Sequence, residues 1–294
     1  MSLEKLEKCN LCQSGDIVTI DEKCNICQCR CCGYIFDNPR PTHDELANYY
    51  SQALRYDECL GENKAWDMLW ERRLKLVKRE KTSGTLLDVG AGIGQFLYLA
   101  QDGFKVKGTE VCDSAVRLAR EKYNIDLISG SLEDINFEDT KFDVITLFHV
   151  LEHVPNPSQT IEKCKALLSE KGILIIAVPN DASSFTIRFF VIRLLSILKI
   201  GKFKVYGKLA LPKLESGATV PIEMHLSHFT PSVLEQAFRS SGFTIIRNTL
   251  DPYYAVKGIK KIVHDFVYYF CIIINKLFGK NIYATIWISA RVKE

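Results

Sequence analysis

The stretch Leu86-Leu87-Asp88-Val89-Gly90-Ala91-Gly92-Ile93-Gly94-Gln95-Phe96-Leu97 organises the interpretation of the whole chain. An apolar run typical of a strand ends near an acid, and a loop with glycine at every second position leads into an amphipathic helix. The glycines permit sharp turns and a close approach of the backbone to a ligand. The first N–H groups of the helix have no partner within it, so the loop can bind a pyrophosphate or a carboxylate. Its spacing is G-x-G-x-G, which differs from the G-x-G-x-x-G of dinucleotide-binding loops.

A second segment makes the interpretation more specific. With Asp88 two residues before the first glycine, the loop resembles motif I of class I S-adenosylmethionine (SAM)-dependent methyltransferases. The segment after the fourth predicted strand, His149-Val150-Leu151-Glu152-His153-Val154, resembles the corresponding segment of ubiquinone-biosynthesis and related small-molecule methyltransferases. The resemblance covers roughly residues 82–180 and resumes at His225-Leu226-Ser227-His228-Phe229-Thr230-Pro231. It implies a SAM-dependent methyltransferase.

The order of strands and helices predicts an α/β fold. Strands are expected at 85–89, 104–110, 125–128, 142–148 and 173–178, with helices between them. This alternation is typical of a doubly wound, mainly parallel sheet that binds its ligand at the carboxyl ends of the strands. Residues 243–247 and 282–292 are the predicted sixth and seventh strands, and the resemblance implies that the last one inserts antiparallel. We therefore expect a seven-stranded, Rossmann-like methyltransferase domain over residues 82–294.

The resemblance also implies which residues bind the cofactor. Glu110 ends the second predicted strand, where a carboxylate can accept hydrogen bonds from both ribose hydroxyls. After the third strand, Ser131 stands where Asp is common in the family and Glu133 follows two residues later, so the partner of the adenine stays open. The complete set of residues expected to bind SAM is Asp88, Gly90, Ala91, Gly92, Gly94, Glu110, Val111, Ser131, Leu132, Glu133 and Phe148.

The N-terminal region is dominated by cysteines, seven of the eleven in the chain. Four of them follow the spacing C-x2-C-x16-C-x2-C, which is typical of a zinc ribbon: Cys9, Cys12, Cys29 and Cys32. Four thiolates form a closed tetrahedral site that stabilises a small domain. Cys24 and Cys27 are a competing pair and Cys31 is a spare, so the choice of ligands stays open. We expect a structural zinc in a ribbon over residues 1–42, followed by a helical linker over 43–81.

Charge and composition bear on the partners. The net charge of +3 is too small to imply a nucleic-acid partner, and no apolar run approaches the roughly 18–20 residues of a membrane span. No export signal is visible, so we expect a cytoplasmic protein with reduced cysteines. Residues 183–214 contain seven basic residues, no acidic one and many apolar ones. Such an insert favours contact with an anionic membrane, here the inner membrane face, or a lid over an acidic substrate; a packed helical cap is the alternative.

Two histidines are the candidate catalytic residues. His149 and His153 follow the fourth predicted strand at i, i+4 spacing, and a histidine can deprotonate a hydroxyl near neutral pH. A purely structural role for either histidine stays open. We expect methyl transfer to a small-molecule acceptor, with a sugar or lipid-linked intermediate of surface-polysaccharide biosynthesis as the leading hypothesis. The alternatives are a ribosomal-RNA methyltransferase with a zinc-ribbon reader and a non-catalytic scaffold. The N/D-P-P-Y/F box of RNA and DNA amino-methyltransferases is replaced by Leu147-Phe148-His149-Val150.

Overall fold

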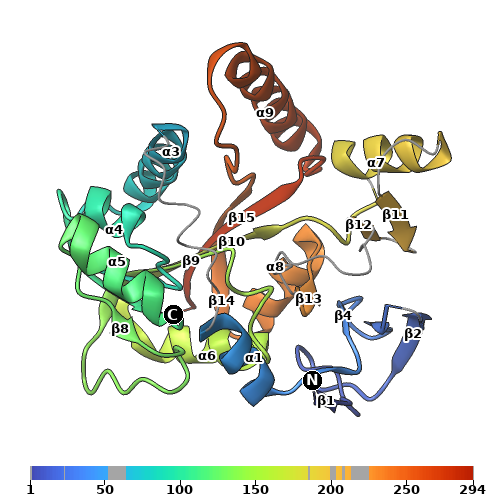
Figure 1. The fold of residues 1–294 in the computed structure, drawn as a ribbon, viewed down its shortest axis with the longest axis horizontal. Coiled ribbons are helices and arrows are strands. Elements are labelled where there is room, and N and C mark those ends of the chain that lie inside the picture. The colour runs from blue at the N-terminus through green and yellow to red at the C-terminus, as the bar shows by residue number, and fades with distance from the viewer. Residues whose placement is uncertain are drawn as a thin grey trace.

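The centre of the molecule is a seven-stranded mixed sheet with the order β14-β15-β10-β9-β6-β7-β8 (Figure 1). The computed structural model describes residues 2–22, 24–51, 64–184, 186–198, 203–206, 209–212 and 225–293. The strands of this sheet are β6 (Gly84–Val89), β7 (Phe104–Glu110), β8 (Ile128–Ser129), β9 (Phe142–Phe148), β10 (Leu168–Pro179), β14 (Phe243–Thr249) and β15 (Thr285–Val292). β6 to β10 pair in parallel, whereas β15 runs antiparallel to both of its neighbours, β10 and β14. The predicted doubly wound sheet with an inserted last strand is therefore confirmed.

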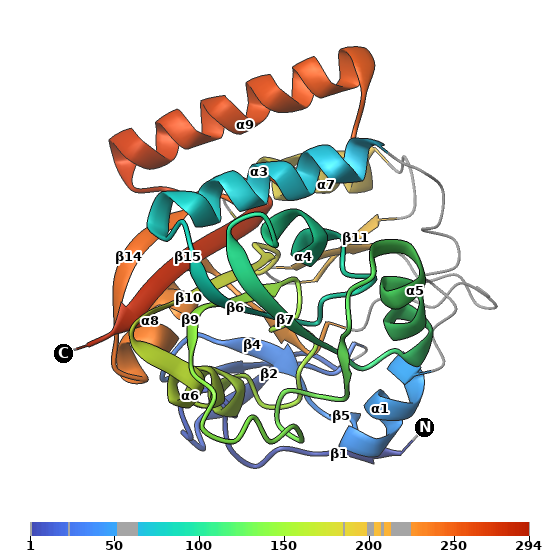
Figure 2. The same cartoon turned by 90° about the vertical axis from the view of Figure 1, so that its left-hand side faces the viewer.

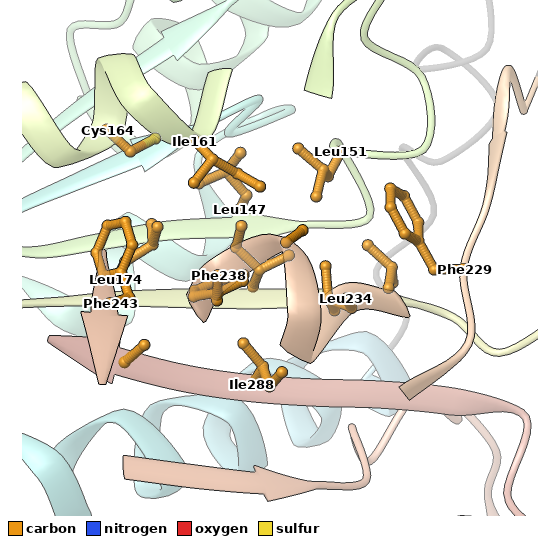
Figure 3. Packing of buried hydrophobic residues seen from close by; sticks show 14 of the residues in the cluster. Leu147, Leu151, Ile161, Cys164, Leu174, Phe229, Leu234, Phe238, Phe243 and Ile288 are labelled. Atoms are coloured by element: carbon orange, nitrogen blue, oxygen red, sulfur yellow. The ribbon is translucent and has the colours of Figure 1, made fainter. Parts of the chain in front are cut away.

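Helices cover both faces of this sheet (Figures 1 and 2). They are α3 (Lys64–Glu80), α4 (Gln95–Ala100) and α5 (Asp113–Tyr123) on one side, and α6 (Pro157–Leu167) and α8 (Pro231–Ser240) on the other. Along β10, Leu174 and Ile176 pack with α6 and α8, whereas Ile173 and Ile175 pack with α3 and α4. Figure 3 shows the first of these two cores, with Leu174 close to Phe243 of β14 and with Phe238 of α8 nearer the centre. Because both faces are buried there, residues 173–178 of this strand form an unbroken apolar run in the sequence.

The N-terminal region forms a second, smaller sheet. It contains β2 (Ile17–Asp21), β3 (Ile26–Cys29) and β4 (Ile35–Asp37), and its fourth strand is β13 (Ser227–His228) from far along the chain. A short ladder of β1 (Leu3–Glu4) with β5 (Arg40–Pro41) lies next to it in sequence, and α1 (His43–Ser51) follows. The cysteine-rich region thus shares backbone hydrogen bonds with the methyltransferase part of the chain.

Several elements differ in extent from the prediction. The third strand, expected at 125–128, is only β8, because Asn124 ends α5 in the left-handed conformation and the buried Ile125 packs into the core before the chain reaches β7. The basic insert contains α7 (Ile187–Ile197) and a hairpin of β11 (Phe203–Tyr206) and β12 (Leu209–Pro212). Residues 185, 199–202, 207–208 and 213–214 of the insert lie outside the described residues. One long helix, α9 (Gly258–Phe278), connects the last two strands.

Candidate functional site

The glycine loop joins β6 to α4 at the carboxyl end of the sheet. Gly90, Gly92 and Gly94 have φ angles of 68°, 56° and 78°, in the left-handed region that only glycine adopts readily. A Cβ added to Gly90 would lie 2.5 Å from Cγ2 of Val150, so this glycine is also required for close packing. Val150 belongs to the segment that carries the two candidate histidines. The structure therefore brings the glycine loop and the histidine segment into direct contact.

Two buried acids support the loop from below. Asp88 is 3% exposed and accepts a hydrogen bond from the Thr146 hydroxyl at 2.6 Å, and burial raises the pKa of Asp88 to about 7. The Glu110 carboxylate accepts hydrogen bonds from the N–H groups of Gly92 at 2.8 Å and Cys112 at 3.0 Å. A carboxylate has about four acceptor positions, so acceptor capacity remains for a ribose hydroxyl. The sequence did not predict that Glu110 also shapes the glycine loop.

The two residues expected near the adenine, Ser131 and Glu133, both form hydrogen bonds with other side chains of the protein. Ser131 donates to the Asp134 carboxylate at 2.6 Å, and Glu133 accepts from the Thr160 hydroxyl of α6 at 2.5 Å. Both polar side chains are thus engaged within the protein, and the question of which one meets the adenine stays open. The other predicted contacts differ in exposure: Val111 is exposed, whereas Ala91, Leu132 and Phe148 are buried.

His149 lies at the centre of a buried charged network. Its Nε2 is 3.2 Å from the Asp251 carboxylate and its Nδ1 is 3.2 Å from the Glu152 carboxylate. Burial alone would lower the pKa of His149, but the two neighbouring carboxylates raise it overall. Arg73 on α3 holds Asp251 through two contacts of 2.9 Å and 2.5 Å. Burial opposes ionisation of Asp251, but Arg73 brings its pKa down to about 2, so the network is charged near neutral pH.

His153 has a different environment. Its Nδ1 is 2.9 Å from the Tyr50 hydroxyl of α1, its Nε2 is 3.9 Å from Glu152, and its ring packs edge-on against His225. Glu152 is 1% exposed, and among the described residues neither of its carboxylate oxygens accepts a hydrogen bond of good geometry. The ligand atoms of Glu152, His153 and His225 lie within 4.8 Å of one another. This cluster can share a proton, or it can hold a divalent cation.

The N-terminal region supports both segments that form this cluster. Behind His153, the carbonyl oxygen of Pro155 accepts hydrogen bonds from Asn10 at 2.8 Å and Arg40 at 2.5 Å. Beside His225, the hydroxyls of Tyr34 and Ser227 are 2.5 Å apart. The cysteine-rich region therefore packs directly against the backbone that positions the two histidines.

The four cysteines predicted as ligands come together in the structure. The Sγ atoms of Cys9 and Cys32 are 3.8 Å apart, those of Cys12 and Cys29 are 3.6 Å apart, and all four lie within 4.8 Å of one another. A tetrahedral zinc with Zn–S bonds of about 2.3 Å requires sulfur–sulfur distances of about 3.8 Å. The residues thus fit a zinc ion. The competing Cys27 is buried elsewhere, with Sγ 3.6 Å from the Thr19 hydroxyl.

Comparison with known proteins agrees with this geometry. Residues 63–248 match a family described as a methyltransferase domain. The chain belongs to this methyltransferase family. Among curated relatives of the methyltransferase, the ubiquinone biosynthesis O-methyltransferase of Glaesserella parasuis is 32% identical over 151 residues, covering 46% of this chain and 64% of the relative. That of Coxiella burnetii is 30% identical over 145 residues, covering 47% and 62%. The matched region thus spans less than two thirds of these relatives.

A solved structure supports the fold of the methyltransferase independently of sequence. A SAM-dependent methyltransferase from Thermotoga maritima superposes with a TM-score of 0.50 at 15% identity, covering 84% of this chain and 100% of that chain. At this identity the similarity bears on the fold alone. Together with the strand order, it identifies the domain as a Rossmann-like class I methyltransferase.

Several residues of the site were not predicted from the sequence. Tyr50, Arg73 and Asp251 lie far from the histidine segment in the chain, and no local pattern indicates that they contact it. Glu152 and His225 were within segments quoted for the family resemblance, but their roles were not identified. The sequence did offer one indication of these two residues, because Glu152 and His225 both belong to short segments that contain several ionisable residues.

His228 connects the two parts of the chain, and its protonation should affect stability. Its Nδ1 is 3.2 Å from Asp181, which follows β10, and its Nε2 is 3.2 Å from Asp37 of β4. Burial alone would lower the pKa of His228, but the two carboxylates raise it from 6.5 to about 9. A raised folded-state pKa contributes stability that is complete below the unfolded-state pKa and is lost as the pH rises through the folded-state pKa.

We therefore predict that His228→Gln destabilises the protein by roughly 3 kcal/mol at pH 6, since a shift of one pKa unit corresponds to about 1.4 kcal/mol. The difference from the unsubstituted protein should shrink steadily between pH 6.5 and pH 9, the window set by the shift. Denaturant unfolding at several pH values measures it. A difference that stays constant across this range would show that His228 is neutral in the folded protein.

Proposed function

We propose that this protein transfers the methyl group of SAM to a small-molecule acceptor. The observation that supports this most strongly is the contact between the glycine loop and the histidine segment, at the carboxyl end of a class I methyltransferase sheet. SAM supplies an electrophilic methyl group on its sulfonium when bound. The protein then has to orient the acceptor and remove its proton.

The cofactor is proposed to lie along the glycine loop. Gly90, Gly92 and Gly94 give the loop the left-handed turns that would let its backbone approach the methionine part, and Glu110 would accept from the ribose hydroxyls. The exposed side chain of Val111 directly follows Glu110 and is suited to cover one face of the adenine. Asp88 is fully buried beneath the loop, so we assign it to support of the loop rather than to contact with the cofactor.

His153 is the proposed general base. In its neutral form the ring would take the proton from an acceptor hydroxyl as the oxygen attacks the methyl carbon, and the buried Glu152 carboxylate would stabilise the resulting imidazolium. Tyr50 would fix the orientation of the ring through Nδ1. His149 is less suited to this role, because the carboxylates on both sides favour its protonated form. We assign His149 to positioning of the segment.

The same cluster offers a second mechanism at the same site. If Glu152, His153 and His225 hold a divalent cation, His153 is a ligand and cannot act as the base. The three ligand atoms are close enough for this, and two imidazoles with one carboxylate form a donor set that binds several divalent metals. Activity that disappears with a chelator and returns with the added cation would select this mechanism.

For the acceptor, we propose a hydroxyl of a sugar or lipid-linked intermediate in surface-polysaccharide biosynthesis. The ubiquinone O-methyltransferase names of the relatives support a small molecule with an oxygen acceptor. A carbon or nitrogen atom is the alternative acceptor. The alternative functions are a ribosomal-RNA methyltransferase and a non-catalytic scaffold. An RNA-binding role for the ribbon is disfavoured, because part of the ribbon's surface packs on the segments that carry His153 and His225.

We further propose that the N-terminal module, residues 1–42, is a structural zinc ribbon bound by Cys9, Cys12, Cys29 and Cys32. Its sulfur geometry supports this ligand set, and its contacts support a role in positioning the acceptor site. The helical linker 43–81 then adds Tyr50 and Arg73 to the same site. The methyltransferase domain proper would extend over 82–294.

Calorimetry with S-adenosylhomocysteine, the product form of the cofactor, tests the proposal. We expect binding at micromolar levels and no comparable binding of NAD. Gly92→Val should abolish binding, because a β-branched residue cannot adopt the φ of 56° without strain and its side chain would enter the space of the methionine part. Thermal unfolding of the variant checks that it remains folded. Preferential binding of NAD would refute the cofactor assignment.

A further inference from the structure

The outward face of α9 is apolar, which is unusual for a helix on the surface of a protein. One side of the helix packs on the protein through Tyr268 and Cys271, which are buried. The opposite side carries large apolar side chains, among them Ile259 at 81% exposure, Phe266 at 72% and Leu277 at 70%. Contiguous exposed patches of this kind mark interaction sites rather than ordinary surface.

These side chains form one continuous face. Apart from Phe278 at the end of the helix, the exposed apolar residues of α9 fall, at 100° per residue, within an arc of about 120° opposite the packed side. They are Ile259, Ile262, Val263, Phe266, Tyr269, Phe270, Ile273 and Leu277. We call these eight residues the α9 face. Among the described residues of the chain, no helix is long and apolar enough to cross a membrane.

The charges around the α9 face are almost all positive. Residues 257–280 contain five lysines and one acid, Asp265. That acid is neutralised within the protein, since it pairs with Lys261 at 2.5 Å and Arg72 at 3.8 Å. Lys260 and Lys276 are exposed and lie to either side of the α9 face, and Lys257 and Lys280 are exposed at the helix ends.

A second helix repeats the pattern. α7 contains Arg188 and Arg193 and no acid, and its exposed apolar side chains include Phe190, Leu194 and Ile197. In both views α9 projects at the top of the molecule and α7 lies just below its level (Figures 1 and 2).

Both helices are attached to the end of the sheet where the candidate site lies. Pro179, the last residue of β10, pairs with Thr285, the first residue of β15. α7 comes after β10 in the chain and α9 comes before β15, so the start of α7 and the end of α9 both connect to the carboxyl end of β10. The backbone N–H of Ile187 also bonds to the carbonyl of Ile282 at 2.9 Å. A surface that binds the α9 face would therefore lie on the side from which an acceptor enters.

We propose that the α9 face is a docking surface for an anionic membrane, with the helix lying in the plane of the interface. An apolar face flanked by basic side chains is suited to this position, in which the apolar residues enter the acyl boundary and the lysines meet the headgroups. A second copy of the chain is disfavoured as the occupant, because a symmetric contact would bring the same lysines of both copies together. The inference goes beyond the proposed methyl transfer and does not depend on the acceptor.

Co-sedimentation with vesicles tests the proposal. We expect binding to vesicles of phosphatidylcholine with phosphatidylglycerol and little binding to phosphatidylcholine alone. Phe266→Ser should weaken binding, and Lys260→Glu with Lys276→Glu should weaken it at least about tenfold, since each basic residue near the surface contributes measurably to the attraction. Matched controls lie elsewhere on the surface: Ile246→Ser for the apolar change, and Lys105→Glu with Lys107→Glu for the charge change.

Each outcome decides the question. Loss of binding in the α9 variants, with the controls unchanged, supports the proposal. Equal weakening in the controls, or no binding of the unsubstituted protein to anionic vesicles, overturns it. A dimer in sedimentation velocity that Phe266→Ser dissociates, without vesicle binding, would assign the face to a second copy instead. Binding of S-adenosylhomocysteine, measured on the same samples, should be unchanged in every α9 variant, which separates this test from the test of the proposed function.

Discussion

Replacing Cys12 or Cys32 by serine is expected to abolish methyl transfer while binding of S-adenosylhomocysteine persists. Four thiolates hold one zinc, so removing one ligand opens the closed site and destabilises the small module that depends on it. The module supports Pro155 and Ser227, next to the segments that carry His153 and His225. The hydrogen bonds of the glycine loop, by contrast, come from Glu110 and β7.

Elemental analysis, calorimetry and an activity assay on the same preparation measure this effect. The unsubstituted protein should contain about one zinc per chain. Cys31→Ser is the matched control, because Cys31 is exposed and lies outside the cluster of four sulfurs. If both serine variants retain stoichiometric zinc and Cys27→Ser loses it, the ligand set is wrong. If zinc is lost and activity remains, the module does not position the acceptor site.

The second large effect is expected at His153. His153→Gln should lower kcat by roughly 10²–10⁴-fold, the usual contribution of a general base, while leaving binding of S-adenosylhomocysteine unchanged. Tyr50→Phe should lower kcat less and shift the acidic limb of the pH–rate profile, because it removes the hydroxyl that contacts Nδ1.

The control for His153 is its neighbour in the same segment. His149→Gln should mainly lower the free energy of unfolding, since it leaves the buried Asp251 and Glu152 carboxylates with one partner fewer. A His153→Gln variant with normal kcat would contradict the assignment of the base. Loss of activity that a divalent cation restores in the unsubstituted, chelator-treated protein would make His153 a metal ligand.

The sequence predicted the sheet because its signals are local. Strands such as β7 and β9 are short segments between turns, and their bounds match the prediction residue for residue. The glycine loop was equally readable, because its conformation needs φ angles that few other residues adopt. The cysteine spacing favoured the four sulfurs that the structure brings together, although it left the competing pair Cys24 and Cys27 open.

The remaining features depend on contacts between distant parts of the chain. The pairing of β13 with β4 and the network of Arg73, Asp251 and His149 join residues that the sequence gives no reason to associate. Distant contacts also reverse a simple expectation: burial alone would lower the pKa of His149, but the Asp251 and Glu152 carboxylates raise it overall, so this histidine is part of a charged network rather than an evident base. The apolar outer face of α9 was not predicted, because a sequence does not show which side of a helix is packed.

The most direct test of the account is transfer of a deuterated methyl group. The purified protein is incubated with deuterated-methyl SAM and separate lipid, metabolite and RNA extracts of the cells from which its gene comes, and the products are read by mass spectrometry. The account predicts a labelled small molecule, bearing the methyl group on oxygen, that is absent with His153→Gln. Label in ribosomal RNA, or S-adenosylhomocysteine binding with no labelled product in any extract, would contradict it in favour of the RNA methyltransferase or the scaffold.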